Sequence, residues 1–384
     1  MSTKIAYVTT ARSDYGPSFW LIHDLFADSR FEVGLVVGGS HLSKTHGNTV
    51  KEIEEDGWPI AARIPFLRGK GDDRSLGIAA GRALAGFAEF FANYRPDIVI
   101  VYGDRYELLP IAGAAVITRT PLAHLCGGDI TEGAIDDQVR HAVTKLSHLH
   151  FPSTKRSAER IRQMGEEPWR IHQVGDPALD HILRSDHASA DELTQHLGFV
   201  PDRNTLLVTF HPVTLELEQM PIQVRELAEA LRAYEGHVVI TAPAPDPGGD
   251  VVRKALEALV RLRPKTILVE NLGSHRYRGL LRLVGAMVGN SSSGLIEACS
   301  VPLPVVNIGA RQNGRERAAN VLDVPPKRNA ILSGIAQVLS PSFGASLISL
   351  MNPYGDGHTS QRVVTILGNL PSRQELMTKR FSPI

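Results

Sequence analysis

Acidic side chains and a histidine gather at the ends of two apolar runs in the first half of the chain. Asp104 comes two residues after the run 98–102, His124 lies near the end of the next run, and Asp129 and Asp136 follow it. Carboxylates and imidazoles can carry protons to and from a substrate. Because parallel strands end at one edge of a sheet, we expect these groups to be neighbours there. This pattern indicates acid–base chemistry, although Asp136 is equally typical of the first turn of a helix.

A second group of polar residues opens an expected helix in the other half. The segment 289–297 reads Gly-Asn-Ser-Ser-Ser-Gly-Leu-Ile-Glu and follows an apolar run. Small residues at such a junction let an anion approach the backbone amides of the helix N-terminus. Ser292 and Ser293 add hydroxyl donors, and Glu297 could accept from ribose hydroxyls. An ordinary helix cap gives the same pattern, so both interpretations stay open.

Arginines suited to phosphate follow two other strands. Arg12 comes after the run 5–9, and Arg311 and Arg315 follow the strand ending at residue 307. The guanidinium group binds phosphate oxygens in pairs, but such residues are also common on solvated surfaces. Together with the segment 289–297, they indicate a diphosphate ligand.

Other cofactor signatures are missing from these loops. Neither GxGxxG nor GxxxxGK[ST] follows a strand here, which argues against a dinucleotide or P-loop site. The histidines and carboxylates do not fall into a compact metal-ligand spacing, and no CxxC pair occurs. We therefore expect no metal and no cofactor.

Short apolar runs alternate with segments of helical period, which predicts βα units and parallel sheets. The pattern stops near residues 176–201 and then restarts, so we expect two doubly wound α/β domains with their ligand-binding edges facing one cleft. The expected strands are 5–9, 31–37, 98–102, 121–125, 149–151 and 171–174, and then 206–210, 237–242, 266–269, 286–288 and 304–307.

Composition limits the possible partners. The 41 Lys and Arg residues balance the 41 Asp and Glu residues, so no net field favours nucleic acid or an anionic membrane. No run of ~18 apolar residues could span a bilayer. The two cysteines, Cys126 and Cys299, form no disulfide framework, as expected in a reducing compartment. We expect a soluble cytoplasmic protein that binds neither nucleic acid nor membrane.

A series of motifs, in the same order, resembles the hydrolysing UDP-N-acetylglucosamine 2-epimerases over about residues 4–330. They are Thr10-Ala-Arg-Ser-Asp-Tyr-Gly16, Gly103-Asp-Arg105, His124-Leu-Cys-Gly-Gly-Asp-Ile-Thr-Glu-Gly-Ala-Ile-Asp-Asp137, Arg140-His-Ala-Val-Thr-Lys145, Phe210-His-Pro-Val-Thr214, Gly289-Asn-Ser-Ser-Ser-Gly294 and Arg311-Gln-Asn-Gly-Arg315.

The resemblance implies a GT-B architecture with two Rossmann-like domains and a cleft between them. On this basis we expect an N-terminal domain at 1–178 with the acid–base residues and a nucleotide-binding domain at 179–358. Residues 359–384 would return to the first domain, with a helix at 360–379. We also expect a homo-oligomer, a dimer or tetramer.

The reaction that the resemblance implies is elimination of UDP from UDP-N-acetylglucosamine, followed by hydration to N-acetylmannosamine, without a cofactor. The expected catalytic residues are Asp104, Asp129, Asp136 and His211. The expected substrate and nucleotide contacts are Arg12, His124, Tyr277, Ser292, Ser293, Gly294, Glu297, Arg311 and Arg315.

One position departs from the family pattern. Relatives carry glutamate or histidine where this chain has Cys126. A thiol, with an ordinary pKa of ~8.5, cannot simply replace a carboxylate as general base. Asp129, which replaces the last glutamate of the motif, is therefore the expected second carboxylate.

Three alternatives remain beside the favoured function. The same reaction could act on a UDP-2,4-diacetamido-6-deoxy sugar, the precursor of legionaminic-type acids. An inverting GT-B glycosyltransferase would share the nucleotide site but would need an acceptor, and the carboxylate cluster disfavours it. A non-catalytic sensor would bind the nucleotide-sugar without releasing UDP.

Overall fold

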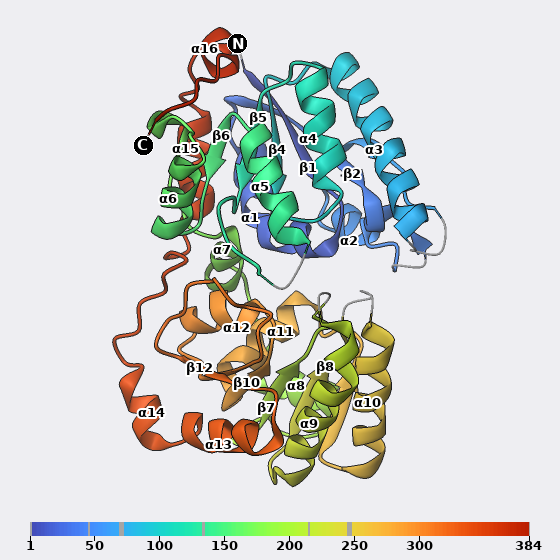
Figure 1. Ribbon diagram of the computed structural model, residues 1–384, viewed down its shortest axis with the longest axis vertical. Coiled ribbons are helices and arrows are strands. Elements are labelled where there is room, and N and C mark those ends of the chain that lie inside the picture. Colours follow the sequence, from blue (N-terminus) through green and yellow to red (C-terminus); the bar gives the residue numbers. More distant parts are fainter. Residues whose placement is uncertain are drawn as a thin grey trace. The chain divides into compact units, whose positions relative to one another are not determined.

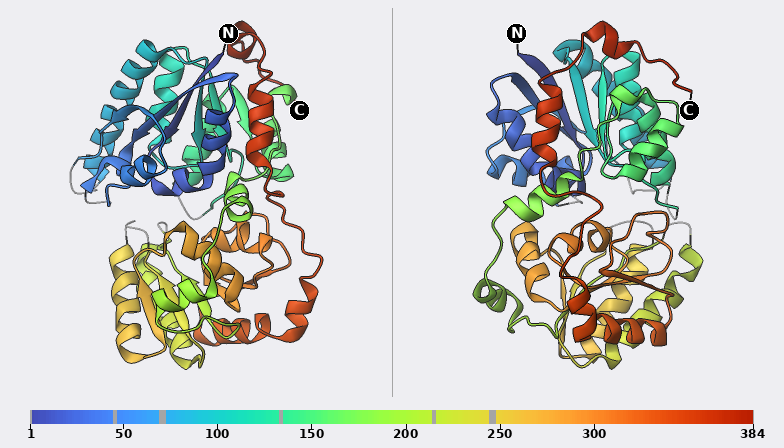
Figure 2. Two further views of the ribbon diagram at one scale, coloured as in Figure 1. Left: turned by 180° about the vertical axis from the view of Figure 1, so that it is seen from behind. Right: turned by 90° about the vertical axis from the view of Figure 1, so that its left-hand side faces the viewer.

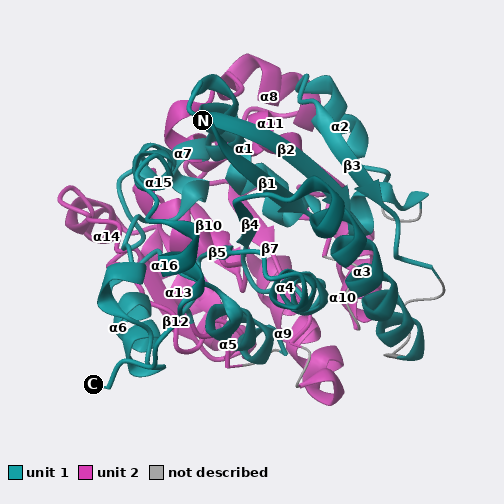
Figure 3. Ribbon diagram, turned by 90° about the horizontal axis from the view of Figure 1, so that it is seen from above, with its two compact units in different colours: residues 1–129, 135–181, 354–384 teal, residues 130–134, 182–353 magenta. Residues whose placement is uncertain are grey.

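The computed structural model describes residues 2–44, 47–68, 73–132, 135–213, 216–243 and 248–383 (Figure 1). Gly133, Ala134 and Thr214, which belong to the motifs above, lie outside the described residues. The chain divides into two compact units (Figure 3). Unit 1 comprises residues 1–129, 135–181 and 354–384, and unit 2 comprises residues 130–134 and 182–353.

Unit 1 is built on a six-stranded parallel sheet in the order β3-β2-β1-β4-β5-β6. The strands are β1 (Thr3–Thr9), β2 (Phe31–Gly38), β3 (Ile60–Ile64), β4 (Ile98–Tyr102), β5 (Leu122–Leu125) and β6 (Leu149–Phe151). The helices of unit 1 are α1 (Arg12–Ala27), α2 (Val50–Glu55), α3 (Asp73–Tyr94), α4 (Leu108–Ile117), α5 (Asp136–Leu146), α6 (Lys155–Gln163), α15 (Thr359–Leu367) and α16 (Arg373–Met377). The helix α7 (Pro177–Arg184) begins in unit 1 and ends in unit 2.

Unit 2 repeats this plan with the sheet order β12-β11-β10-β7-β8-β9. Its strands are β7 (Leu206–Thr209), β8 (Val238–Thr241), β9 (Thr266–Val269), β10 (Ala286–Gly289), β11 (Val305–Ile308) and β12 (Val321–Val324). Its helices are α8 (Ala190–Leu197), α9 (Met220–Ala233), α10 (Gly249–Leu262), α11 (Gly273–Leu283), α12 (Ser293–Ile296), α13 (Arg328–Val338) and α14 (Pro341–Ser346).

Burial on both faces explains why the central strands are apolar throughout. In β1, Ile5 and Tyr7 join the core beneath α1 and α15, whereas Ala6 and Val8 join the core beneath α3 and α4. Successive side chains of a strand point to opposite faces, and a parallel sheet covered by helices buries both. The same alternation divides the strands of unit 2 between its two cores.

Both sheets have the Rossmann strand order, since the second order repeats the first when its strands are renumbered from one end. All strands are parallel, but the direction in which successive strands are added to the sheet reverses between β1 and β4 in unit 1 and between β7 and β10 in unit 2. Ligands of doubly wound sheets bind beyond the strand carboxyl ends at such switch points. The expected fold class of two doubly wound parallel sheets is therefore confirmed.

Some expected elements were wrong or missed. Residues 171–174 form no strand, because Ile171 makes only an isolated bridge to His150. The expected helix at 360–379 is interrupted after Leu367, where Gly368 and Pro371 occupy the turn, and continues as α16. The helix expected to open at the segment 289–297 is a single turn, α12, followed by the 3₁₀ turn Ala298–Ser300.

The C-terminal helices belong to unit 1, where α15 packs against α1 (Figure 2). Arg170 fastens the last segment by donating to the carbonyl oxygens of Leu376 at 2.8 Å and Thr378 at 2.9 Å. Within the described ranges, no helix is long and apolar enough to cross a membrane.

Candidate active site

Asp104 lies at the switch point of unit 1, two residues beyond β4. Gly103 precedes it with a φ of +86°, a backbone conformation that glycine adopts without strain. The Asp104 carboxylate pairs with Arg140 of α5, whose side chain is 2% exposed. Nη1 of Arg140 also donates to the carbonyl oxygen of Asp129 at 2.9 Å. Arg140 therefore ties the end of β4 to the segment that follows β5.

His124 holds the turn formed by Gly103 and Asp104. Its Nε2 lies 2.7 Å from the carbonyl oxygen of Gly103, so this nitrogen must carry the proton and donate. Nδ1 then accepts from the hydroxyl of Thr144 at 3.1 Å. Burial lowers the pKa of His124 to about 4, which keeps the ring neutral at physiological pH. His124 thus holds the turn that carries Asp104, and its contact with a nucleotide stays a prediction.

Asp129 and Asp136, the other two predicted catalytic carboxylates, have surroundings that differ from those of Asp104. Asp129 is 7% exposed, and its Oδ1 accepts from the hydroxyls of Ser157 and, at 3.4 Å, Ser153. Asp136 is the half-buried first residue of α5. Arg140 follows one turn later in α5. The main chain of Asp129, the side chain of Asp104 and the start of α5 therefore all lie near the Arg140 guanidinium. The catalytic roles of Asp129 and Asp136 stay predictions.

Cys126 directly follows β5 and has a φ of +59°. Its thiol donates to Oδ2 of Asp176 at 3.6 Å. Burial, together with the charges of Asp176 and Asp129, raises the pKa of Cys126 well above its usual value. The thiol therefore stays protonated and neutral, which agrees with the argument that it does not replace a glutamate as base.

Sequence reasoning missed the roles of two residues in this region. The sequence places Arg140 only within a motif, and its pattern assigns no role to Asp176. Asp176 is 1% exposed, precedes α7 and accepts from the amide of Ala178 at 2.9 Å. An aspartate followed by proline is a helix-start signal, so the sequence could have indicated its capping role but not its contact with Cys126.

Arg12 is the first residue of α1, directly beyond β1 at the same switch point. Its side chain is 38% exposed, and Nε lies 3.6 Å from Glu52. The turn before it is fixed by the buried Asp14, whose carboxylate accepts from the amides of Thr10 at 3.0 Å and Ala11 at 3.1 Å. Arg12 belongs to unit 1, whereas the other predicted nucleotide contacts except His124 belong to unit 2.

In unit 2, His211 and Asn290 lie at the switch point, beyond β7 and β10. The side-chain amide of Asn290 forms hydrogen bonds with both the main-chain N–H and the main-chain carbonyl of His211. Arg311 Nη1 in turn donates to the carbonyl oxygen of Asn290 at 3.0 Å. Burial, with a smaller contribution from the Arg311 charge, lowers the pKa of His211 to about 3. Burial therefore favours the neutral form of the His211 ring.

Tyr277, Ser293 and Glu297 come together beside α12. The Tyr277 hydroxyl lies 2.6 Å from the Ser293 hydroxyl. Burial and the nearby Glu297 charge raise the pKa of Tyr277. Ser292 and Gly294 lie in the same turn, where the Gly294 amide donates to the carbonyl of Ser291 at 3.2 Å. Four of these predicted contacts therefore share the short segment 292–297, and Tyr277 reaches it from α11.

Arg315 is placed apart from that segment. Its Nη2 lies 3.2 Å from the hydroxyl of Thr131, and its Nε lies 3.4 Å from the carbonyl oxygen of Ile130. Residues 130–134 belong to unit 2 although the chain on either side belongs to unit 1. Arg315 therefore binds this inserted segment, and its contact with phosphate stays a prediction.

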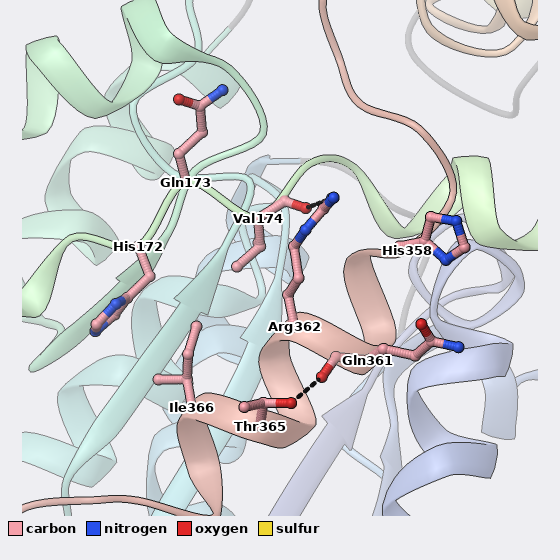
Figure 4. A pocket seen from close by; sticks show the side chains of 8 residues that line it. All are labelled: His172, Gln173, Val174, His358, Gln361, Arg362, Thr365 and Ile366. Atoms are coloured by element: carbon pink, nitrogen blue, oxygen red, sulfur yellow. Dashed lines mark hydrogen bonds between the residues drawn. The ribbon is translucent and has the colours of Figure 1, made fainter.

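A hollow of about 600 Å³ on unit 1 contains none of the predicted residues (Figure 4). It is lined by α15 and the segment before α7. Arg362, at its centre, is already paired through both terminal nitrogens with Asp356, at 2.8 Å and 2.7 Å. His172 and His358 lie on opposite sides of it and do not converge (Figure 4). This hollow therefore lacks a free set of converging polar groups.

The side chains at the switch point of each unit are of types that can transfer protons or bind anions. Among the described ranges, no group of three His, Cys, Asp or Glu residues is arranged to hold a metal ion. Carboxylates stand at the switch point of unit 1, and hydroxyls, amides and an arginine stand at that of unit 2. Two such Rossmann-like units in one chain define the GT-B type of fold.

Comparisons with known proteins agree with this class. The family model described as UDP-N-acetylglucosamine 2-epimerase matches residues 23–368. UDP-N,N'-diacetylbacillosamine 2-epimerase (hydrolyzing) of Legionella pneumophila is 37% identical over 379 residues, covering 99% of each chain. GDP/UDP-N,N'-diacetylbacillosamine 2-epimerase (hydrolyzing) of Campylobacter jejuni is 34% identical, covering 83% of this chain and 84% of its own.

A solved structure shows the same fold. UDP-GlcNAc 2-epimerase from Neisseria meningitidis, bound to UDP-GlcNAc, superposes with a TM-score of 0.82 at 16% identity, covering 94% of this chain and 99% of that chain. The chain belongs to the UDP-N-acetylglucosamine 2-epimerase family.

Proposed function

We propose that the protein is a hydrolysing nucleotide-sugar 2-epimerase whose substrate is UDP-N,N'-diacetylbacillosamine, a 2,4-diacetamido-6-deoxy sugar nucleotide. The observation that carries this proposal is the 37% identity, over 99% of both chains, to the Legionella enzyme of that name. The substrate favoured from the sequence, UDP-N-acetylglucosamine, is the second candidate, because the family description and the Neisseria structure name it.

In the proposed mechanism, unit 1 moves the protons and unit 2 holds the nucleotide. A carboxylate of unit 1, for which we propose Asp104 or Asp136, takes the proton from carbon 2 of the sugar. The bond from carbon 1 to the diphosphate breaks, and UDP leaves with the electron pair. Hydroxyls and Arg311 of unit 2 stabilise the charge of the leaving diphosphate. Water then adds across the resulting double bond, with its proton at carbon 2 and its hydroxyl at carbon 1.

The first expected result is deuterium at carbon 2 of the free sugar after reaction in deuterated water. Elimination breaks the bond between carbon 2 and its hydrogen, and hydration makes a new one from solvent. Both candidate substrates are incubated separately, and the product is examined by proton NMR and mass spectrometry. The preferred substrate is the one with the larger kcat/KM.

Other outcomes identify the other functions. A product that retains its hydrogen at carbon 2, or that remains attached to the nucleotide, contradicts the hydrolysing reaction. UDP release only in the presence of a sugar acceptor identifies a glycosyltransferase. Tight binding without UDP release identifies a sensor. Deuterated product from UDP-N-acetylglucosamine alone supports the reaction and rejects the diacetamido substrate.

The second expected result concerns nucleotide affinity. Arg12→Ala and Glu297→Ala should each weaken UDP binding by about 1.5–3 kcal/mol, the value of a hydrogen bond to a charged group. Isothermal titration calorimetry with UDP alone measures this. Arg232→Ala and Glu229→Ala, on the exposed face of α9, are matched controls and should bind UDP normally. Unchanged affinity in both Arg12→Ala and Glu297→Ala would remove these residues from the nucleotide site.

A further inference from the structure

Asn290 makes a reciprocal pair of hydrogen bonds with the main chain of His211. Its Oδ1 accepts from the His211 amide at 2.7 Å, and its Nδ2 donates to the His211 carbonyl oxygen at 2.8 Å. The two residues are 79 positions apart in the chain. The Asn290 side chain therefore accepts and donates the same two hydrogen bonds that the main chain of a neighbouring strand would make. It does so at the point where β7 and β10 end.

The main-chain pairing between the two segments comes to an end at Gly289 and Asn290. Gly289 has a φ of +140°, and a Cβ at this position would clash with the carbonyl oxygen of Thr209. The amide of Asn290 still donates to that same oxygen at 3.1 Å, which is the last main-chain bond between the two segments. Beyond it, the asparagine side chain joins the main chain of His211 to the end of β10.

The chemistry of this contact requires a primary amide. Asn290 is 1% exposed, so an unpaired donor or acceptor on either side would be costly. A carboxylate would keep the acceptor but place a second oxygen against the His211 carbonyl. Alanine would leave both main-chain groups of His211 without this partner.

The main-chain carbonyl of Asn290 has a separate task. It accepts from Arg311 at 3.0 Å and from the Gln312 side chain at 2.8 Å. Since these bonds go to the main chain, a substitution of the Asn290 side chain leaves them available. The side chain of Asn290 therefore contacts His211, and its main-chain carbonyl contacts Arg311 and Gln312.

We propose that Asn290 is the positioning residue of His211, setting through its side-chain amide where the imidazole stands in the reaction. The inference rests on the proposed function and on the expectation from the sequence that His211 is a catalytic residue of that reaction. A displacement of about 1 Å can cost on the order of 10²-fold in rate. The contact with the His211 main chain therefore affects turnover through the position of the imidazole.

A double-mutant comparison tests this proposal. Asn290→Ala should lower kcat by about 10- to 100-fold. In a His211→Ala background, the same substitution should lower kcat little further, because its target is already gone. Asn290→Asp, which keeps the volume and the acceptor but not the donor, should be impaired like Asn290→Ala. Multiplied losses in the double variant, or normal turnover of both Asn290 variants, would overturn the proposal.

Histidine NMR separates positioning from general destabilisation. The imidazole signal of His211 is identified by its absence in His211→Ala and should shift in both Asn290 variants. Asn320→Ala is the matched control, since Asn320 is also buried in unit 2 and donates to a different carbonyl, that of Leu303, at 2.8 Å. It should leave the His211 signal and kcat unchanged. An unmoved His211 signal in the Asn290 variants contradicts the proposal.

The outcomes distinguish this inference from the proposed function. Normal turnover of His211→Ala would show that His211 is not catalytic, whatever Asn290 does, and would end both the role of His211 and this inference. Impaired His211→Ala with unimpaired Asn290→Ala would reject only the positioning role. Deuterium at carbon 2 in the wild-type product tests the reaction independently of both.

Discussion

Asp104→Asn is expected to lower kcat by about 10²- to 10⁴-fold, the usual contribution of a general acid or base. Asparagine has nearly the same shape, and its amide oxygen can still accept from Arg140, but it cannot take up a proton. UDP affinity should be unchanged, because the proposed role of Asp104 is proton transfer and not phosphate binding. Steady-state kinetics and calorimetry with UDP measure the two effects separately.

The control for this substitution is Asp191→Asn, which removes an exposed carboxylate from the first turn of α8. It should have normal turnover and normal UDP affinity. Asp136→Asn should be impaired like Asp104→Asn if both carboxylates transfer protons. Normal turnover of Asp104→Asn would exclude it as the acid or base and leave Asp136 as the candidate.

The central strands were predictable because they are buried on both faces. Residues 98–102 form an apolar run, and the strand has the predicted bounds. The two missed strands, β3 and β12, lie at the edges of their sheets and are only partly buried. Arg63 and Asp323 interrupt their apolar pattern. An edge strand needs less apolar surface, so periodicity alone does not reveal it.

The candidate site was predictable to the extent that it follows strands in the chain. Asp104 and His211 each lie just beyond a buried run, and the topology of parallel sheets places such residues at one edge. The contacts that hold them were not predictable. Arg140 reaches Asp104 across 36 positions, and Asn290 reaches His211 across 79. Such contacts depend on how helices and loops pack, which the order of residue types does not specify.

His124 also shows that the contacts of a residue cannot be predicted from its place in the sequence. His124 carries a group able to bind a ligand, and the sequence places it at the correct sheet edge. Its environment is nevertheless internal, because both ring nitrogens are bonded to Gly103 and Thr144. Only the tertiary structure shows that this ring supports the Asp104 turn.

Arg140→Met is expected to have the second large effect, on both stability and turnover. The substitution leaves the Asp104 carboxylate without its guanidinium partner and removes a donor from the carbonyl of Asp129. Breaking a buried ion pair costs about 3–5 kcal/mol. Asp104 is 22% exposed and regains some water, so we expect the lower end of that range. For a unit of this size, thermal unfolding should then occur about 6–12 °C lower.

The coupling between Arg140 and Asp104 separates their interaction from lost packing. In an Asp104→Asn background the ion pair with Asp104 is already gone, so Arg140→Met should lower the melting temperature by less than it does in the wild type. Arg140→Lys keeps the charge but presents one nitrogen in place of two, so its kcat should lie between those of the wild type and Arg140→Met. Calorimetric melting and kcat, measured well below the transition, test both points. Additive losses of stability would show that Arg140 stabilises the unit through packing, and a normal kcat in Arg140→Met would show that it does not hold Asp104 for the reaction.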